Sequence, residues 1–397
     1  MKNNPNPMSR RKFLAVTGAV GLGSMLAPTG LLAATSLPPK VARKPFGKTG
    51  VEVSALGLGC MFDIIDNQII LQRAFDHGVN YWDTAAVYEK GGSERGIGMF
   101  LEKNPSARNE LFITTKGKIS ELPQTLDESL ARLKTDHVDL FLLHGVSSID
   151  EVDRLKIRAF AERAKQEGKI RFIGFSTHSN MAECLMAAPR LGWIDAILFT
   201  YNYRIMHEPD LVLAMEACDR AGIALIAMKT QGQRQREDTS EQQALLTPFA
   251  ARGFTPGQAK LKVAMEHPHI STAIVQMPNL RLCRENIAAA LDQTRLADYD
   301  YALLERYAAA TAGTYCAGCR RHCEQALGGA VPVQDVMRQL MYHRNYGGEV
   351  DARALFADLP ARVREQLPLL DYQGAERACP RHLPVGQLMR EASGLLA

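Results

Sequence analysis

From residue 53 onward the chain alternates short apolar runs with longer stretches in which apolar residues recur every three or four positions. Short apolar runs predict buried β-strands and the longer stretches predict amphipathic helices, so the alternation is typical of βα units on a parallel sheet. Several helical stretches end at a glycine placed to stop a helix, at Gly78, Gly168 and Gly222. The expected helices include 124–133, 151–166 and 209–221, and the expected strands are 53–59, 80–84, 111–115, 138–144, 172–176, 196–201, 224–228 and 272–276.

Eight such units within roughly 240 residues indicate a (β/α)8 TIM barrel. A doubly wound open sheet is the alternative, but it calls for a glycine-rich phosphate-binding turn after its first strand, and Gly57-Leu58-Gly59-Cys60 is only a short turn. Beyond Leu291 the alternation stops. We therefore expect an α/β fold with the barrel over residues 45–298, followed over residues 299–397 by a small, mainly helical domain that bears cysteines.

Residues 1–36 are expected to precede the fold as an export signal. Ser9-Arg10-Arg11-Lys12-Phe13-Leu14 is a twin-arginine pattern, and the uncharged stretch after it, rich in Gly and Ala, ends in small residues. A membrane anchor of similar length is the alternative, but the glycines, prolines and threonines make this stretch only weakly apolar, as twin-arginine signals tend to be. The pattern predicts recognition by the twin-arginine export machinery, export in folded form, and a periplasmic or membrane-anchored, outward-facing location.

Composition and charge narrow the range of partners. Of the 397 residues, 46% are hydrophobic and 23% are charged, and the net charge is +4. The Lys and Arg residues are scattered, with no basic stripe and no interleaved aromatic residues, so nucleic acid is not an expected partner. The chain is therefore expected to be a globular protein with one large core and a smaller additional unit.

Four polar residues fall at the ends of neighbouring predicted strands. Asp83 ends the second strand, Lys116 ends the third and His144 ends the fourth. Tyr88 follows in the loop after Asp83. Because the chemistry of such barrels lies at the carboxyl ends of the strands, these side chains are expected at one rim. Each residue alone also has a structural explanation, such as a helix-capping Asp, a core Tyr or His, or a surface Lys.

The segments that carry these four residues resemble the aldo-keto reductases. The resemblance extends from about residue 45 to residue 291. It implies an oxidoreductase that exchanges hydride between a nicotinamide cofactor and a small aldehyde, ketone or alcohol. The matching segments are Phe46-Gly47-Lys48-Thr49-Gly50, Tyr81-Trp82-Asp83-Thr84-Ala85-Ala86-Val87-Tyr88, Gly92-Ser93-Glu94 with Gly96, Ile113-Thr114-Thr115-Lys116, Val138-Asp139-Leu140-Phe141-Leu142-Leu143-His144 and Ile173-Gly174-Phe175-Ser176.

By this resemblance, Tyr88 is the general acid and base and His144 orients the carbonyl. Reduction by hydride leaves negative charge on the carbonyl oxygen, which must be protonated. A phenol with a pKa near ~10 is a poor acid at neutral pH. We therefore expect the Lys116 ammonium to lower the pKa of Tyr88, and a buried Asp83 carboxylate to hold that ammonium in place.

The cofactor positions match the family less closely. Ser176 stands where family members hold the nicotinamide carboxamide, but Thr177 replaces the usual Asn, and Met228 replaces an aromatic residue that stacks on the ring. The usual Lys for the 2′-phosphate is absent, and Arg281 or Arg284 could take its place, so NADP is favoured over NAD only weakly. The positions implied to bind the cofactor are Ser176, Thr177, Met228, Lys229, Arg281, Glu285 and Asn286, of which Glu285 and Asn286 match the pair that contacts adenine.

Four of the eight cysteines lie in the C-terminal region, at Cys316, Cys319, Cys323 and Cys379. Soft thiolates in this number suit an iron–sulfur cluster or zinc. The region resembles, in eroded form, the ferredoxin-like domain that some family members carry at the C-terminus. In two-cluster ferredoxins the last cysteine of one motif ligates the cluster of the other motif. The resemblance therefore implies that the four cysteines are the complete ligand set of one 4Fe–4S cluster.

Three alternatives stay open for these four cysteines. They could form two disulfides in an oxidising compartment, hold structural zinc with His322 as a further ligand, or be a relic without metal. The cysteines at 60, 184, 218 and 283 fall in strand or helix patterns and are most simply small buried hydrophobic residues.

The leading hypothesis is an exported oxidoreductase whose cluster could pass electrons to or from a partner. An exported protein is not expected to meet a free pool of nicotinamide cofactor, so the cofactor would have to be bound tightly before export. The alternative is a non-catalytic electron-transfer or binding protein built on the same barrel.

Overall fold

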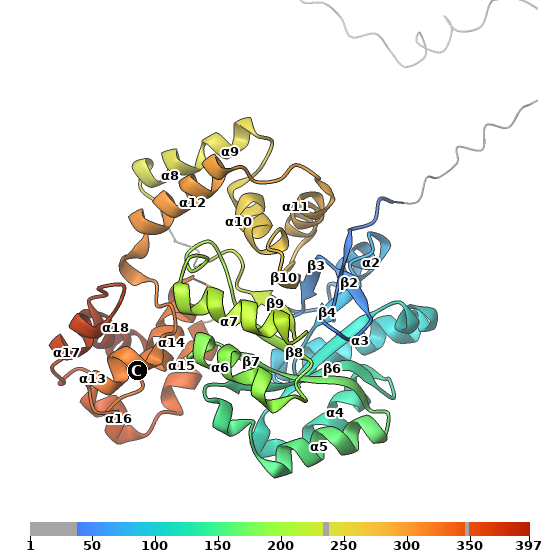
Figure 1. Cartoon of the computed structure of the whole chain (residues 1–397), viewed down its shortest axis with the longest axis horizontal. Coiled ribbons are helices and arrows are strands. Elements are labelled where there is room, and N and C mark those ends of the chain that lie inside the picture. Colours follow the sequence, from blue (N-terminus) through green and yellow to red (C-terminus); the bar gives the residue numbers. More distant parts are fainter. Residues whose placement is uncertain (1–37, 233–237, 346–348) are drawn as a thin grey trace, which may run out of the picture. The chain divides into compact units, whose positions relative to one another are not determined.

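Eight parallel strands form a closed barrel in the computed structural model, which describes residues 38–232, 238–345 and 349–397. The strands follow one another around the barrel in chain order, and the last pairs with the first (Figure 1). This arrangement confirms the predicted (β/α)8 barrel and excludes the open sheet. The barrel strands are β3 (Leu56–Gly59), β4 (Tyr81–Asp83), β5 (Phe112–Gly117), β6 (Val138–Val146), β7 (Ile170–Thr177), β8 (Ala196–Thr200), β9 (Ala224–Met228) and β10 (Ile270–Gln276).

The barrel helices largely follow the predicted pattern. Gly78, Gly168 and Gly222 adopt φ angles of 74°, 71° and 70° just after helices, as glycines that end helices do. The helix expected from residue 151 begins only at Leu155, because Arg154 is extended. The helices are α2 (Gln68–Asp76), α3 (Gly92–Lys103), α4 (Gln124–Leu133), α5 (Leu155–Gln166), α6 (Met181–Ala187), α7 (Pro209–Arg220), α8 (Ser240–Leu246), α9 (Pro248–Ala251), α10 (Pro256–Met265) and α11 (Leu280–Leu291).

The prediction of a single first strand over residues 53–59 is wrong, because this segment forms two strands. β2 (Glu52–Ser54) pairs antiparallel with β1 (Arg43–Pro45), and β3 begins only at Leu56. The Ser54 hydroxyl donates to the Leu56 carbonyl oxygen at 2.6 Å, which turns the chain between the two pieces. Phe46 beside this hairpin packs against Phe112, with ring centroids 4.8 Å apart, and so fills the amino end of the barrel.

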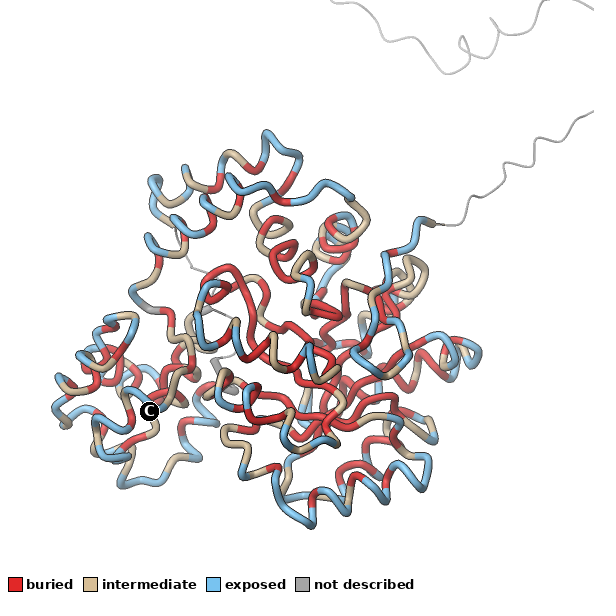
Figure 2. Tube along the Cα trace, viewed as in Figure 1, coloured by how far each residue is buried: buried red, intermediate tan, exposed pale blue. Residues whose placement is uncertain are grey.

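A third hydrophobic core lies in the C-terminal region, between residues 331 and 396. It is distinct from the core between the strands and their helices and from the core inside the barrel. Figure 2 shows the most continuous burial along the barrel strands. The predicted helical C-terminal region is confirmed, and consists of α12 (Asp298–Ala310), α13 (Arg320–Ala326), α14 (Val333–Asn345), α15 (Glu349–Ala357), α16 (Ala361–Gln366), α17 (Gln373–Ala378) and α18 (Val385–Leu396).

The predicted export signal lies outside the residues that the structure describes. Among the described residues, every helix is too short or too polar to cross a membrane. The twin-arginine signal therefore stays a prediction.

Candidate active site

Lys116 is buried at the carboxyl end of the barrel, in contact with two of the other predicted site residues. Its Nζ lies 2.6 Å from Asp83 Oδ1 and 3.3 Å from the Tyr88 hydroxyl oxygen. It also donates to the Thr84 carbonyl oxygen at 2.7 Å. Asp83 is in register with Thr114 on the neighbouring strand. Because alternate residues of a strand share a face, Lys116 points to the same side as Asp83.

The loop after β4 places Tyr88 beside this ion pair. The Ser93 hydroxyl donates to the Cys60 carbonyl oxygen at 2.7 Å and contacts the Thr84 hydroxyl, which ties the loop to two strand ends. The ring of His144, at the end of β6, lies nearly perpendicular to that of Tyr88, with centroids 6.1 Å apart. The structure thus brings Asp83, Tyr88, Lys116 and His144 to one rim.

Burial and neighbouring charges shift the pKa values of the residues at this rim in opposite directions. Burial would lower the pKa of Lys116, but Asp83 and Tyr88 raise it above its usual value, so the amine is an ammonium. Burial raises the pKa of Tyr88 by more than Lys116 lowers it. Lys116 thus lowers the pKa of Tyr88, as predicted, but burial outweighs this effect, because the phenolate loses more hydration on burial than one ammonium replaces. Tyr88 is a protonated phenol at neutral pH.

The His144 imidazole is uncharged at neutral pH. Burial, with repulsion from Lys116 and Arg338, lowers the pKa of His144 to about 3. A neutral imidazole can both donate and accept a hydrogen bond. The rim therefore offers a protonated phenol and a neutral imidazole next to one fixed positive charge.

The residues expected at the nicotinamide end are partly engaged in contacts within the chain. Ser176 Oγ accepts a hydrogen bond from the Gly145 amide at 3.0 Å. The Thr177 hydroxyl donates to the Ser179 carbonyl oxygen at 2.8 Å, within its own loop. Met228 is buried at the end of β9. Lys229, which follows it, donates to the Tyr342 hydroxyl at 2.9 Å.

The residues expected at the adenine end lie on α11. Arg281 Nη1 pairs with Glu285 Oε1 at 2.8 Å, and the Arg281 side chain is 70% exposed. Asn286 is buried on the same helix. Arg281 and Glu285 are thus accessible at the surface but neutralise each other.

Residues 65–309 match the family model described as "Aldo/keto reductase family". The chain belongs to the aldo/keto reductase family. Membership confirms the predicted class of enzyme, an NAD(P)-dependent oxidoreductase of the aldo-keto reductase type. Residues 310–397, which hold the four clustered cysteines, lie outside the match.

Known relatives cover the barrel of this aldo/keto reductase. L-galactose dehydrogenase of Arabidopsis thaliana is 26% identical over 306 residues, which make up 67% of this chain and 95% of that protein. A thermostable aldo-keto reductase solved with the inhibitor epalrestat is 26% identical, with a TM-score of 0.54, over 67% of this chain and 99% of its own. An aldo-keto reductase from Klebsiella pneumoniae, solved with NADPH, is 24% identical, with a TM-score of 0.55, over 67% of this chain and 95% of its own.

The four C-terminal cysteines line one small, mainly apolar pocket. All four are free thiols, so the structure gives no support to the two-disulfide alternative. Burial raises the pKa of Cys316 and Cys323 to about 12. Within the described part of the chain, no three Cys, His, Asp or Glu side chains converge closely enough to hold a single metal ion. The zinc alternative therefore gains no support either.

Two loops, one with Cys316 and Cys319 and the other with Cys379, are attached to the barrel rim and are called the cysteine loops. The Gly318 carbonyl oxygen accepts from the Asn180 amide at 2.9 Å, just beyond the end of β7. Gly318 has a φ of +80°, and a Cβ there would lie 2.5 Å from the His178 carbonyl oxygen, so only glycine fits. Arg381 Nη2, two residues after Cys379, donates to the Arg204 carbonyl oxygen at 2.6 Å and to Glu208 Oε1 at 2.7 Å.

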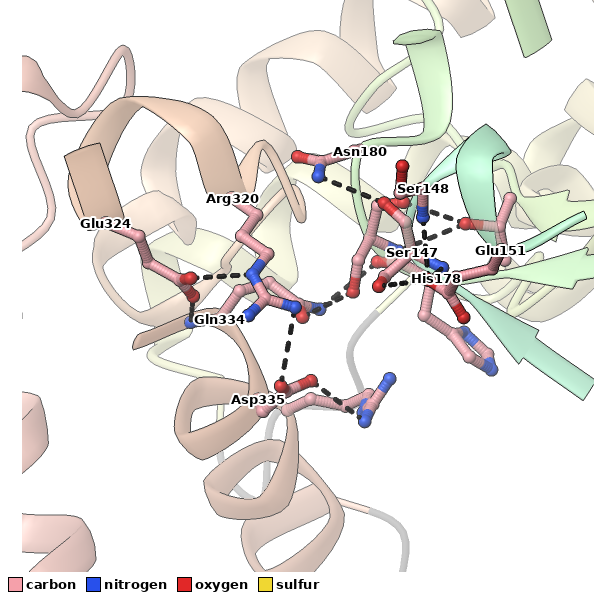
Figure 3. Close-up of polar contacts among 12 residues, drawn as sticks. Ser147, Ser148, Glu151, His178, Asn180, Arg320, Glu324, Gln334 and Asp335 are labelled. Atoms are coloured by element: carbon pink, nitrogen blue, oxygen red, sulfur yellow. Dashed lines mark hydrogen bonds and ion pairs between the residues drawn. The ribbon is translucent and has the colours of Figure 1, made fainter. Parts of the chain in front are cut away.

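Helix α14 contributes site residues that the sequence did not reveal. Figure 3 shows Gln334 and Asp335 of α14 together with Arg320 and Glu324 of α13, facing the loops that carry Asn180 and His178. The polar residues Gln334, Arg338 and Tyr342 recur every four positions, and this spacing was the available signal. Spacing alone, however, cannot say which partner a helix face meets.

The buried histidines predict a loss of stability in acid. His144 has a pKa of about 3 in the folded protein, below its usual value of 6.5, so unfolding takes up a proton below pH 6.5. The stability it contributes is present above that pH and is lost as the pH falls towards the folded value. Replacing His144 with Gln should reduce the loss of unfolding free energy between pH 7 and pH 5 by about 1 to 2 kcal/mol.

Thermal or denaturant unfolding of both proteins at the two pH values measures this difference. An equal slope in the His144→Gln protein would contradict the burial of a neutral imidazole.

Proposed function

We propose that this aldo/keto reductase exchanges hydride between a nicotinamide dinucleotide, NADP in preference to NAD, and a small aldehyde, ketone or alcohol. The observation that carries the proposal is the contact of the Lys116 ammonium with both Asp83 and Tyr88 at the carboxyl rim. A phenol, an ammonium, a carboxylate and a neutral imidazole together supply a proton donor and charge stabilisation for carbonyl reduction.

Each residue has a distinct part in the chemistry. The nicotinamide, when bound, supplies or accepts the hydride. Tyr88 donates its Oη proton to the carbonyl oxygen as negative charge develops there, and Lys116 stabilises the phenolate that is left. Asp83 keeps the Lys116 ammonium charged and in place. His144, being neutral, donates a hydrogen bond that orients the carbonyl oxygen.

The residues present fit a nicotinamide dinucleotide that stays bound. Arg281 is exposed on α11 and would suit a phosphate that displaces Glu285 from it, and Ser176 stands at the strand end expected for the carboxamide. Helix α14 reaches the nicotinamide end of the expected cofactor site through the contact of Tyr342 with Lys229. A covered nicotinamide end favours retention of the cofactor, as an exported enzyme without a free cofactor pool requires.

Replacing Tyr88 with Phe should abolish turnover, with kcat falling at least about 10²-fold, because the proton donor is lost. Steady-state assays with NADPH and a panel of aldehydes and ketones measure the effect. The exposed Tyr299 on α12 provides the control, and its replacement with Phe should leave kcat unchanged. Unchanged turnover in the Tyr88→Phe protein would overturn the assignment.

The engaged Thr177 and Lys229 also favour a second candidate, a non-catalytic electron-transfer or binding protein on the same barrel. Release of nucleotide from the purified protein separates the two. Bound nicotinamide dinucleotide favours the enzyme, and an empty barrel beside an intact cluster favours the alternative.

A 4Fe–4S cluster is the proposed occupant of the cysteine pocket. All four cysteines line this one pocket, and a 4Fe–4S cluster is held by four cysteine thiolates. Residues Cys316, Cys319, Cys323 and Cys379 would each supply one thiolate.

The pocket also supports a link between the cluster and the barrel. Cys316, Gln334 and Met337 line the cysteine pocket and also a second pocket that reaches Lys229 and His178 at the rim. A cluster in this place would fix the two cysteine loops and α14 on the rim. It would also lie where electrons could pass between the rim and an external one-electron partner, which we propose as its second role.

Anaerobically purified protein should contain about four irons per chain. Replacing Cys379 with Ser should remove most of the iron and the visible absorbance, because one of four ligands is lost. The buried Cys184 lies outside the pocket, so Cys184→Ala should keep both. Iron and zinc analysis with a visible spectrum makes the measurement, and stoichiometric zinc or no metal in the unaltered protein would contradict the cluster.

Export through the twin-arginine pathway is proposed from the pattern at Arg10-Arg11. Replacing both arginines with lysines should leave the folded protein in the cytoplasm, as cell fractionation would show. Arg43→Lys, on β1, is the control. Continued export of the double variant would contradict the pathway.

A further inference from the structure

The amino end of helix α3 contacts the two strands that carry the Asp83–Lys116 ion pair. Ser93 and Glu94, in the first turn of α3, are polar residues that are completely buried. The segment Gly92-Ser93-Glu94 resembles the family, yet the proposed reaction uses neither side chain. Buried polar side chains are tolerated in a fold only where they have hydrogen-bond partners, so the partners of these two residues indicate what they do.

Ser93 belongs to a buried chain of hydrogen bonds between three segments of the rim. Its hydroxyl donates to the carbonyl oxygen of Cys60, just after β3, at 2.7 Å. Its Oγ also lies 2.7 Å from Thr84 Oγ1. A serine hydroxyl has one proton to donate. Because that proton is directed to Cys60, the Thr84 hydroxyl donates to Ser93, and the chain runs from Thr84 through Ser93 to Cys60.

Thr84 connects this chain of hydrogen bonds to the catalytic ammonium. Its carbonyl oxygen accepts from Lys116 Nζ at 2.7 Å, and Asp83 Oδ1 accepts from the same ammonium at 2.6 Å. The Thr84 amide donates to the carbonyl oxygen of Thr114 on β5 at 2.8 Å. The backbone amide and the side-chain hydroxyl of Thr84 are therefore both bonded, and together they fix the direction of its carbonyl oxygen towards Lys116.

Glu94 holds the neighbouring strand from its other face. Its Oε1 accepts from the Thr115 hydroxyl at 2.5 Å, and its Oε2 accepts from Arg132 Nε at 2.6 Å. Thr115 directly precedes Lys116 on β5, and successive residues of a strand point to opposite faces. The amino end of α3 thus contacts both structures that support the ammonium, the Thr84 segment and β5.

We propose that Thr84 and Ser93 are positioning residues that hold the Lys116 ammonium where it meets both Asp83 and Tyr88. The inference rests on the proposed function, since the reaction concerned is hydride transfer with Tyr88 as acid in reduction and as base in oxidation. A lysine ammonium has three protons to donate. Asp83, the Thr84 carbonyl oxygen and Tyr88 accept all three, so the Thr84 oxygen is one of the three atoms that define where the charge lies.

The position of this charge matters because its contact with Tyr88 is the longest of the three. Lys116 Nζ lies 3.3 Å from the Tyr88 hydroxyl oxygen, beyond the usual range of an N–H···O hydrogen bond. A small shift of the ammonium away from Tyr88 would break this contact. Misplacement of a catalytic group by about 1 Å can cost about 10²-fold in rate. Loss of a support that acts through Lys116 is expected to cost less, about 10-fold.

Steady-state kinetics of the full chain, purified anaerobically and assayed with NADPH and a panel of aldehydes and ketones, test the positioning role. Thr84→Val removes the hydroxyl and nearly keeps the shape of the side chain. It should lower kcat about 10-fold, with little change in KM, because the ammonium is displaced and the substrate contacts are kept. Thr84→Ser keeps the hydroxyl and should recover most of kcat.

A double-mutant cycle tests whether the two hydroxyls act as one chain. Ser93→Ala should lower kcat about as much as Thr84→Val, and the double variant should lose no more than the weaker single variant, because both changes interrupt the same chain. Losses that multiply would overturn the chain. Ser54→Ala is the matched control, since Ser54 is also buried and its hydroxyl donates to the Leu56 carbonyl oxygen at 2.6 Å, at the amino end of the barrel. It should lower the free energy of unfolding and keep kcat.

Crystal structures of the unaltered protein and of Thr84→Val give a readout that does not depend on turnover. In the variant, the distance from Lys116 Nζ to the Thr84 carbonyl oxygen or to the Tyr88 hydroxyl should lengthen by about 0.5 Å or more, which exceeds the tolerance for a catalytic group. If Thr84→Val does not fold, the structure of Ser93→Ala makes the same comparison.

The outcomes separate this proposal from the proposed function. If Tyr88→Phe loses turnover while Thr84→Val and Ser93→Ala keep kcat, the positioning role is overturned and the proposed function stands. If the unaltered protein turns over no carbonyl or alcohol, the proposed function fails and the crystal structures decide. A displaced ammonium then supports the positioning chain, and an ammonium in its original place overturns it.

Discussion

A positive charge buried at the mouth of the barrel organises the site around it. The Lys116 ammonium is almost completely removed from water, and such a charge is tolerated only where an opposite charge and further hydrogen-bond acceptors surround it. Asp83, the Thr84 carbonyl oxygen and the Tyr88 hydroxyl provide them. These groups come from two adjacent strands and one loop, so the closure of the barrel and the position of the ammonium depend on each other.

The C-terminal region extends the same rim. Gly318, Gln334 and Arg381 bind backbone or side-chain groups just beyond the ends of β7 and β8. Two of these contacts lie within two residues of a cysteine. Binding of one cofactor by the four thiols would therefore fix both cysteine loops and α14 in their positions on the rim. The proposed cluster and the barrel site would then form a single functional unit.

The sequence predicted the barrel and its site well for one physical reason. Each strand places its last polar residue at the same rim, so Asp83, Lys116 and His144 could be grouped from strand ends alone. The glycines that end α2, α5 and α7 were equally readable, because they need positive φ. The break at Ala55 between β2 and β3 could not be predicted, since it depends on a hydrogen bond of the Ser54 side chain. The sequence indicated that Lys116 lowers the pKa of Tyr88, but not that burial outweighs this effect, because a sequence does not report burial.

The parts contributed by the C-terminal region could not be found in this way. The spacing of Gln334, Arg338 and Tyr342 defines a helix face, but not the strand ends that it meets. Likewise, the contacts of Thr177 and Lys229 within the chain depend on long-range packing, so their expected roles at the cofactor were drawn from resemblance alone.

The contacts of Gly318, Gln334 and Arg381 hold the cysteine loops and α14 on the rim as one unit with the barrel. Amide hydrogen exchange of the anaerobically purified protein and of the Cys379→Ser protein tests this coupling, because exchange reports local opening. If the proposed cluster fixes these loops, its loss should speed exchange in α14 and also at residues 178–180 at the end of β7, while the amino end of the barrel keeps its protection. Equal protection at residues 178–180 with and without iron would contradict it.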